Sequence, residues 1–224
     1  MRKESQKAKK ARAAESVSAL EELYPSAECA LEYNGDPWRL LVMGRLSAQC
    51  TDARVNEVSV DLFSRFPSAL EMADGDIAEI EDLVKPCGLY RMKAKNIKDA
   101  SRMLIDDFGG ELPSDMDSLL KFPGVGRKIA NLLIGDIFGG EAIVCDTHCI
   151  RICGRLGMYP ESEKNPEKIE RMLRGLMNPA DGPDFCHRIV FFGREVCTAR
   201  SPQCDGCPLA ELCEHNKKRR GSAL

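Results

Sequence analysis

The chain has 224 residues, of which 43% are hydrophobic and 30% charged, and its formal net charge is −3 at pH 7. These values are ordinary for a globular protein, and no apolar run approaches the roughly 20 residues that span a membrane. The basic first twelve residues lack the apolar stretch of a secretory signal, so we expect a soluble, non-secreted protein with one large or two small cores.

Apolar residues recur at helical spacing along nearly the whole chain, which predicts an all-α fold. Asp36 and Pro37 begin a helix that runs through Leu46, with the proline in the first turn, where it is tolerated. Thr51 and Asp52 cap the following helix, and Gln49 lies on the bend between the two.

Two segments, 83–94 and 119–130, share a pattern at a constant offset of 36 residues. Five pairs are identical: Leu83/Leu119, Lys85/Lys121, Gly88/Gly124, Arg91/Arg127 and Ala94/Ala130. The repeat predicts two helical hairpins of similar build, and the alternative is a chance similarity between short helical segments.

The second hairpin is predicted to open with a capping box, Ser114-x-x-Asp117, on a short helix that ends near Phe122. A proline and a glycine stop that helix, and another helix begins after Gly126. This later helix is predicted to bury Ile129, Ala130, Leu133 and Ile137, and to turn Lys128, Asn131 and Gly135 away from that core.

Basic residues are concentrated around the two hairpins. Residues 83–98 contain five of them and residues 119–131 contain three, and neither segment has an acid. We interpret this distribution as one basic face on an acidic protein, with unorganised surface charge as the alternative.

The sequence Phe122–Lys128 places a Pro-Gly-Val-Gly turn directly before a helix. Backbone N–H groups at a helix N-terminus bind phosphate, and Gly124 and Gly126 let a nucleic-acid backbone approach closely. The predicted DNA contacts are Gly124, Val125, Gly126 and Arg127. Lys128, beside Arg127 at the positive end of the helix, is a candidate nucleophile that forms a Schiff base with a sugar carbon, and simple pairing with phosphate is the alternative.

Asp146 precedes a helix that is predicted to run to about Leu156 and to stop at Gly157. Its ordinary role is an N-cap, whereas its chemical role is to stabilise positive charge on a sugar and to help the nucleophile lose its proton. The two roles are compatible. We expect His148 to be a structural hydrogen-bonding residue rather than a base.

Four cysteines near the end of the chain follow the pattern C-x6-C-x2-C-x5-C: Cys197, Cys204, Cys207 and Cys213. Four thiolates so close in sequence can close one four-coordinate metal site. The wide spacers favour an iron–sulfur cubane, with zinc as the alternative, because only one C-x2-C pair is present. Disulfides fit poorly, since eleven cysteines is an odd count, and we expect a reduced cytosolic protein.

Three further cysteines, Cys145, Cys149 and Cys153, share one face of a predicted helix. A second metal site is the alternative, but cysteine is often fully buried, so we expect small apolar core residues. The four remaining cysteines are assigned no function.

In order and spacing, the sequence GVGRK at 124–128, the sequence DTH at 146–148 and the cysteine pattern resemble the endonuclease III family of base-excision repair glycosylases. The resemblance covers about residues 30–214. It implies that Lys128 is the Schiff-base lysine, that Asp146 is the catalytic aspartate, and that the four cysteines of the pattern hold a [4Fe-4S] cluster.

The resemblance also implies two helical domains. Residues 30–140 would form a six-helix barrel with a helix-hairpin-helix, and residues 1–29 and 141–224 would form the iron–sulfur cluster domain. Double-stranded DNA would lie across the groove between them.

Gln49 and Leu89 lie in segments that resemble the family's two probes of the duplex. In that resemblance Gln49 fills the gap left by the flipped nucleotide, and Leu89 wedges into the stack opposite, where an apolar side chain offsets the cost of unstacking. Ordinary core packing is the alternative for Leu89. The sequence departs from the family pattern at Ile129 and Cys145, and the loop at 198–203 offers only Arg200 as a basic DNA contact.

The implied function is a bifunctional DNA glycosylase and abasic-site lyase that removes oxidised pyrimidines from duplex DNA. Lys128 would attack C1′ of the flipped nucleotide, the base would leave, and β-elimination would cut the strand. We expect a monomer associated with the nucleoid in the cytoplasm. The rivals are an adenine-mismatch glycosylase, whose branch lacks this lysine and carries an extra C-terminal domain, and a non-catalytic DNA-binding scaffold.

Overall fold

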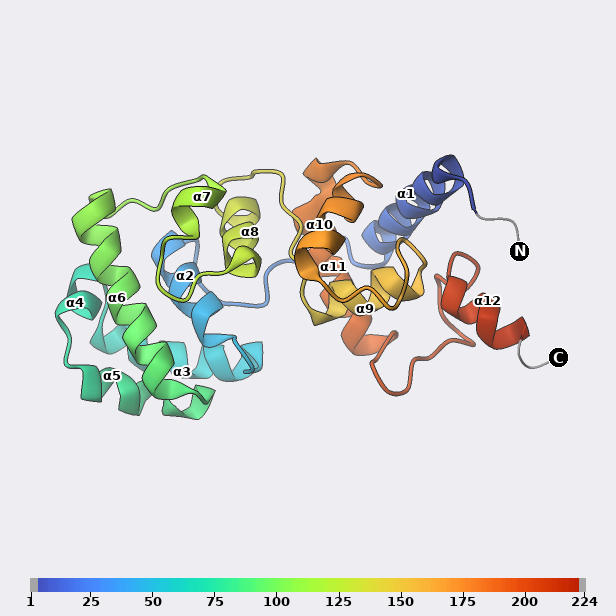
Figure 1. The fold of residues 1–224 in the computed structure, drawn as a ribbon. Coiled ribbons are helices and arrows are strands. Elements are labelled where there is room, and N and C mark those ends of the chain that lie inside the picture. The colour runs from blue at the N-terminus through green and yellow to red at the C-terminus, as the bar shows by residue number, and fades with distance from the viewer. Residues whose placement is uncertain (1–3, 222–224) are drawn as a thin grey trace. The chain divides into compact units, whose positions relative to one another are not determined.

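The computed structural model describes residues 4–221, and every regular element in that range is a helix (Figure 1). The all-α prediction is therefore confirmed. None of the helices between residues 4 and 221 is both long and apolar enough to cross a membrane. The chain divides into two compact units, one of residues 29–139 and one that joins residues 1–28 to residues 140–224. The family resemblance had implied boundaries at residues 30 and 140.

The unit of residues 29–139 holds seven α-helices and one 3-10 turn. They are α2 (Pro37–Leu46), α3 (Asp52–Arg65), α4 (Ala69–Asp74), α5 (Ile77–Val84), η1 (Lys85–Cys87), α6 (Tyr90–Phe108), the single-turn α7 (Met116–Leu119) and α8 (Arg127–Asp136). Their apolar faces meet in one core around Leu41, Leu62, Ile97 and Phe122, each at most 2% exposed. Trp38 closes that core with an indole N–H that donates to Ser101 Oγ at 2.9 Å.

The second unit is built from both ends of the chain. It contains α1 (Gln6–Leu23), α9 (Thr147–Arg155), α10 (Pro166–Arg174), the 3-10 turn η2 (Pro179–Asp181), α11 (Gly182–Glu195) and α12 (Glu214–Gly221). Leu20 of α1 packs with Ile152 of α9 and with Phe185 and Phe192 of α11 in a separate core. The N-terminal helix is thus part of the same core as the C-terminal elements.

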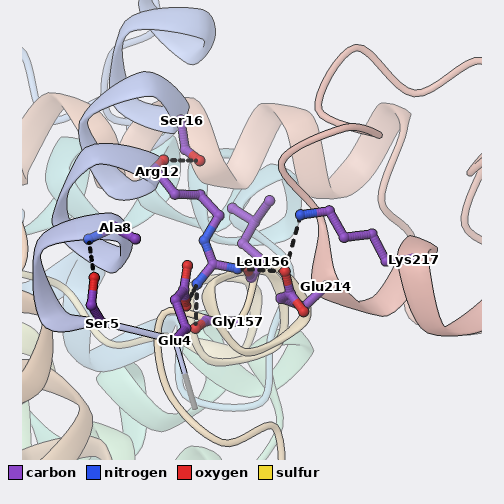
Figure 2. Close-up of polar contacts among 9 residues, drawn as sticks. All are labelled: Glu4, Ser5, Ala8, Arg12, Ser16, Leu156, Gly157, Glu214 and Lys217. Carbon is purple, nitrogen blue, oxygen red and sulfur yellow. Dashed lines mark hydrogen bonds and ion pairs between the residues drawn. The ribbon is translucent and has the colours of Figure 1, made fainter. Parts of the chain in front are cut away.

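Arg12 fastens α1 to this unit (Figure 2). Its guanidinium is 7% exposed and donates to the carbonyl oxygens of Leu156 and Gly157 at 2.8 and 3.1 Å, at the C-terminal end of α9. The same group pairs with Glu4 at 2.6 Å and with Glu214 at 3.1 Å. A cation at a helix C-terminus satisfies carbonyls that have no partner within the helix, so this contact joins α1, α9 and α12.

Side-chain caps set most of the helix starts. The carboxylate of Asp36 accepts from the N–H of Arg39 at 3.1 Å and begins α2, and Thr51 caps α3, both as predicted. Asp52, also predicted as a cap, is instead the first residue of α3. The capping box at Ser114 is wrong: the cap of α7 is Asp115, which accepts from the N–H of Ser118 at 2.9 Å. The helix α7 thus begins one residue later than predicted. It lasts a single turn, so it ends at Leu119 rather than near Phe122.

Candidate nucleic-acid interface and metal centre

The turn between α7 and α8 packs against the side chain of Arg45. Gly124 has φ +77°, and a Cβ there would lie 2.4 Å from Nε of Arg45, a buried residue of α2. With the amide of Asn96 oriented so that its oxygen faces Arg45, that oxygen accepts from the guanidinium at 2.9 and 3.0 Å. Only glycine combines this φ with so close an approach. The turn is therefore preformed, and Arg45 is a supporting residue that the sequence analysis missed.

The N-terminus of α8 begins directly after this turn. Gly126 is its N-cap, with φ −104° and no side chain to occupy the first N–H groups of the helix. Val125, one of the predicted DNA contacts, is buried, and its N–H donates to the carbonyl oxygen of Phe122 at 3.0 Å. Its side chain and its amide are therefore both used within the hairpin. Lys128, in the first turn of α8, is exposed.

The predicted division of α8 into two faces is confirmed at four positions and wrong at one, and Ile137, predicted on the core side, is the C-cap and is half-buried against that core. Ile129, Ala130 and Leu133 are buried and Lys128 faces outward. Asn131 is only 1% exposed, although its position along the helix assigned it to the outer side. The rest of the unit covers a wider part of the surface of α8 than the positions of its apolar residues indicate, so Asn131, at the edge of the apolar face, is buried as well.

Gln49 and Leu89 project from the same unit with an unusual backbone. Gln49 is exposed with φ 55°, and Leu89 is 51% exposed with φ 48°. The part of the chain that the structure describes contains only one other non-glycine residue with positive φ, Asn34. Leu89 is not a core residue, which removes the alternative of ordinary packing.

The basic segment around the first hairpin is less exposed than its sequence indicates. Lys93 is fully buried, and the ammonium of Lys98 donates to the carbonyl oxygens of Ala73, at 2.9 Å, and Gly75 at the end of α4. Lys95 pairs with Asp99 at 2.6 Å. The single basic face expected from residues 83–98 is therefore wrong for part of that segment, because several of its charges are bound within the unit.

Asp146 lies in the second unit, whereas Lys128 lies in the first. Its carboxylate caps α9 by accepting from the N–H of Cys149 at 2.7 Å, which confirms the predicted cap. The helix ends at Arg155, with Leu156 as its C-cap and Gly157 at φ +78°, as predicted.

His148 follows Asp146 by two residues and is the second residue of α9. Nδ1 of His148 lies 3.2 Å from Nη2 of Arg151. A Cβ on Gly193 of α11 would lie 2.4 Å from the same Nδ1 atom of His148. The imidazole is thus packed at the contact between α9 and α11. This position confirms the prediction of a structural hydrogen-bonding residue.

The four cysteines of the C-terminal pattern line one cavity: Cys197, Cys204, Cys207 and Cys213. Apolar side chains complete its wall, among them Ile152, Phe192 and Leu209. Burial raises the pKa of the thiols of Cys207 and Cys213, and the neighbouring cysteines raise it further. Such a group of thiols carries its charge readily only when a metal centre neutralises it. The donor set and the enclosing wall therefore fit a four-cysteine cluster.

Two arginines of α9 hold the loop that carries these cysteines. Arg155 donates to Sγ of Cys197 at 3.3 Å and to the carbonyl oxygen of Thr198 at 2.8 Å. Arg151 donates to the carbonyl oxygen of Cys197 at 3.0 and 3.2 Å. The two arginines are four residues apart, so they lie on the same face of α9, and this spacing is a sequence signal for their shared contact. Arg200, the predicted basic contact of the loop, is exposed.

The three cysteines of α9 and its approach are buried, as predicted. Cys145, Cys149 and Cys153 are 8%, 0% and 0% exposed, and the sulfur atoms of the last two lie 4.0 Å apart. Hydrogen bonds with Cys145, Cys153 and Cys186, together with burial, raise the pKa of the Cys149 thiol. The three buried cysteines act as small core residues.

Two family models match the chain. Residues 42–179, more than half of the chain, match the HhH-GPD superfamily of base excision DNA repair proteins, and residues 197–213 match the iron–sulfur binding domain of endonuclease III. The chain belongs to the endonuclease III family. The second match covers all four cysteines of the C-terminal pattern, and the cofactor of this family member is a [4Fe-4S] cluster, as the sequence predicted.

Relatives and solved structures agree with the membership. The chain is 46% identical to endonuclease III of Synechocystis sp., over 92% of this chain and 93% of the relative, and 43% identical to endonuclease III of Bacillus subtilis, over 91% and 92%. The structure matches a non-covalent endonuclease III–DNA complex with a TM-score of 0.89, at 39% identity over 95% of this chain and 98% of that one. It matches a trapped covalent endonuclease III–DNA intermediate with a TM-score of 0.88, at 39% identity over 94% and 98%.

Proposed function

We propose that this protein is a bifunctional glycosylase and abasic-site lyase of base excision repair, which removes oxidised pyrimidines from duplex DNA. The observation that carries the proposal is the exposed Lys128 in the first turn of α8, directly after Gly126, which has no side chain to cover the first N–H groups of that helix. Family membership supports the glycosylase activity, and the two matched structures are an endonuclease III with DNA and a covalent intermediate.

In the proposed reaction the neutral amine of Lys128 attacks C1′ of the flipped nucleotide. The N-glycosidic bond breaks, and the base leaves with the bonding electrons and takes up a proton. Ring opening gives a Schiff base between Nζ and C1′, and loss of a C2′ proton expels the 3′ phosphate and cuts the strand. Water then releases the lysine. Asp146 stabilises the positive charge that develops on the sugar.

The remaining residues hold the DNA. The N–H groups at the start of α8 and the side chain of Arg127 bind phosphate, and Arg200 contributes from the cluster loop. Gln49 fills the gap that the flipped nucleotide leaves, and Leu89 enters the stack opposite. The cluster holds the fold of the loop that its ligands join. We also propose that the protein works as a monomer, inside the cell and on the nucleoid.

Borohydride trapping on duplex DNA with an abasic site tests the chemistry. Lys128→Gln removes the amine and keeps a polar side chain of similar length, so it should abolish the trapped complex and strand cleavage while duplex affinity stays within about threefold. Lys95→Gln is the matched control, because Lys95 is an exposed lysine of the same unit that pairs with Asp99. A trapped complex that forms at the normal rate with Lys128→Gln would show that another amine is the nucleophile.

The choice of substrate separates the rival functions. Duplexes that contain thymine glycol, an abasic site or an A:8-oxoguanine pair should be cut in the first two cases and left intact in the third. Excision of adenine from the third would favour the mismatch branch. Binding to all three duplexes without any reaction would favour a scaffold.

A further inference from the structure

Lys93 is a fully buried lysine at the end of the first turn of α6. Its ammonium donates to the carbonyl oxygen of Leu46 at 2.8 Å and to that of Cys87 at 2.7 Å. Burial lowers the pKa of this ammonium. Transfer of a charged amine from water to a protein interior is costly unless hydrogen bonds compensate it, so the two carbonyl contacts are what keep the side chain in place.

The hairpin repeat shows that burial at this position does not require a lysine. Lys93 corresponds to Ile129 at the offset of 36 residues, and Ile129 is 9% exposed at the same place in α8. An apolar residue fills the site in the second hairpin, while a charged one fills it in the first. The charge in the first hairpin therefore has a task other than filling the core.

The two carbonyl groups that Lys93 binds are the last of their helices. Leu46 ends α2 and Cys87 ends η1, so both oxygens lie where a helix leaves carbonyls unpaired and where a cation is favoured. Gln49 follows Leu46 by three residues, and Leu89 follows Cys87 by two. One ammonium thus joins the ends of the two segments that carry the predicted DNA probes.

Both probes have a backbone conformation that their residue types avoid. A left-handed φ costs a residue such as glutamine or leucine about 1–2 kcal/mol, so it persists only where the surroundings fix it. The two contacts from Lys93 fix the chain three residues before Gln49 and two residues before Leu89. Burial raises the pKa of the Cys87 thiol, and Cys50, the residue after Gln49, raises it further, so the two segments lie close together.

We propose that Lys93 is a positioning residue that holds Gln49 and Leu89 together in their strained conformations, so that both enter the duplex in one step. The inference rests on the proposed function, in which these two residues open the duplex. Lys93 itself does not touch DNA, since its side chain is buried.

The test is single-turnover kinetics of Lys93→Met on two duplexes, one with thymine glycol and one with a preformed abasic site. Base excision needs a stacked nucleotide to be extruded, whereas an abasic site has no base to unstack. We expect excision to slow by about tenfold or more and abasic cleavage to change by less than about threefold. The fluorescence rise of 2-aminopurine placed next to the lesion, which reports unstacking, should be lost in parallel.

Lys98→Met is the matched control. Lys98 lies on the same helix and also binds two carbonyl oxygens at a helix end, but these belong to α4, which carries no predicted DNA contact. It should leave both rates and the fluorescence signal unchanged. A double variant with Leu89→Ala adds a second criterion, because residues that act together have non-additive effects: Lys93→Met should slow excision by less in the Leu89→Ala background than in the wild type.

Equal losses of excision and abasic cleavage in Lys93→Met, or an unchanged fluorescence signal, would overturn the proposal. If Lys93→Met does not fold, as judged by circular dichroism and iron content, Lys93→Gln replaces it, because glutamine keeps one donor group but cannot reach both carbonyls. The same two rates and the same signal then decide. If the wild-type protein itself fails to excise thymine glycol, the proposed function has failed rather than the role of Lys93.

Discussion

Asp146 combines a structural contact with a proposed chemical role in one carboxylate. Its oxygen caps α9 at 2.7 Å from the N–H of Cys149, and an asparagine can make the same contact. We expect Asp146→Asn to change the free energy of unfolding by less than about 1 kcal/mol. Glycosylase activity should fall by about a hundredfold or more, because a neutral amide cannot balance charge developing on the sugar.

Asp146→Ala provides the comparison, because it removes both the cap and the charge. Thermal melting should then show an additional loss of about 1 kcal/mol relative to Asp146→Asn, with a similar loss of activity. Full activity in Asp146→Asn, measured on duplexes with thymine glycol, would leave the carboxylate with its structural role alone.

Leu89 is an apolar side chain that the fold leaves half exposed. Replacement by alanine removes little buried area, so Leu89→Ala should melt within about 2 °C of the wild type. Base removal from duplex DNA should slow by about tenfold or more, because the wedge that offsets unstacking is lost. Leu119→Ala is the control: Leu119 is fully buried, and its truncation should cost about 2–5 kcal/mol of stability. Wild-type excision rates in Leu89→Ala would exclude the wedge.

Individual residues differ in how far the sequence alone can place them. The four cysteines of the metal centre are predictable because their chemistry depends on spacing within a few residues. Lys93 and Asn131 are not, because a single-helix pattern assigns charged and polar residues to the outer face. Lys93 is buried because a carbonyl of α2, 47 residues earlier in the chain, completes its hydrogen bonds.

Among the elements, the second hairpin contains two glycines with different physical requirements. Gly124 needs a positive φ and lies against Arg45, so Gly124→Ala should destabilise the protein by about 3 kcal/mol. Gly126 has a negative φ, and a Cβ there would meet no atom within 4 Å, so Gly126→Ala should cost less than about 1 kcal/mol. Chemical denaturation measures both differences.

The same pair separates folding from binding. A methyl group at Gly126 stands where a phosphate would approach the first N–H groups of α8, so Gly126→Ala should weaken duplex binding although the protein is folded. Fluorescence anisotropy with undamaged duplex DNA provides the measurement. Unchanged affinity would mean that the backbone of this turn does not contact DNA.

Helix starts were predictable wherever a single capping side chain decides them. Asp36, Thr51 and Asp146 each precede a helix with the expected contact. The start of α7 was not, because Ser114 and Asp115 are adjacent and both suit an N-cap, and the structure uses Asp115. The two hairpins follow the repeat: Gly88 and Gly124 both have positive φ before α6 and α8.

At the scale of the whole molecule, the residues before the first unit and those after it form one core. Periodicity alone could not pair these two segments, because the contact between α1 and α11 joins positions far apart in the sequence. The pairing was predicted only through the family resemblance. Arg12 is the polar part of that pairing, and the basic N-terminal segment gave no sign that one of its arginines is buried.

Arg12 therefore links the N-terminal helix to the metal centre. Its partner Glu214 begins α12 directly after Cys213, and Arg12 also binds the end of α9, whose Arg155 donates to Cys197. Arg12→Ala leaves the carbonyls of Leu156 and Gly157 without this donor, and we expect a loss of about 2–3 kcal/mol in the free energy of unfolding. The cluster should also be lost faster to a chelator, as measured by its visible absorbance.

Arg54→Ala is the control for that experiment. Arg54 pairs with Glu57 at 2.6 Å, but both side chains are about half exposed or more, and such a pair contributes less than about 1 kcal/mol. Its melting temperature and its cluster lifetime should match those of the wild type. If Arg12→Ala loses stability while its cluster persists as long as in the wild type, the arginine supports the core alone. Parallel losses of stability and cluster would show that the N-terminal helix holds two of the four ligands in place through one guanidinium.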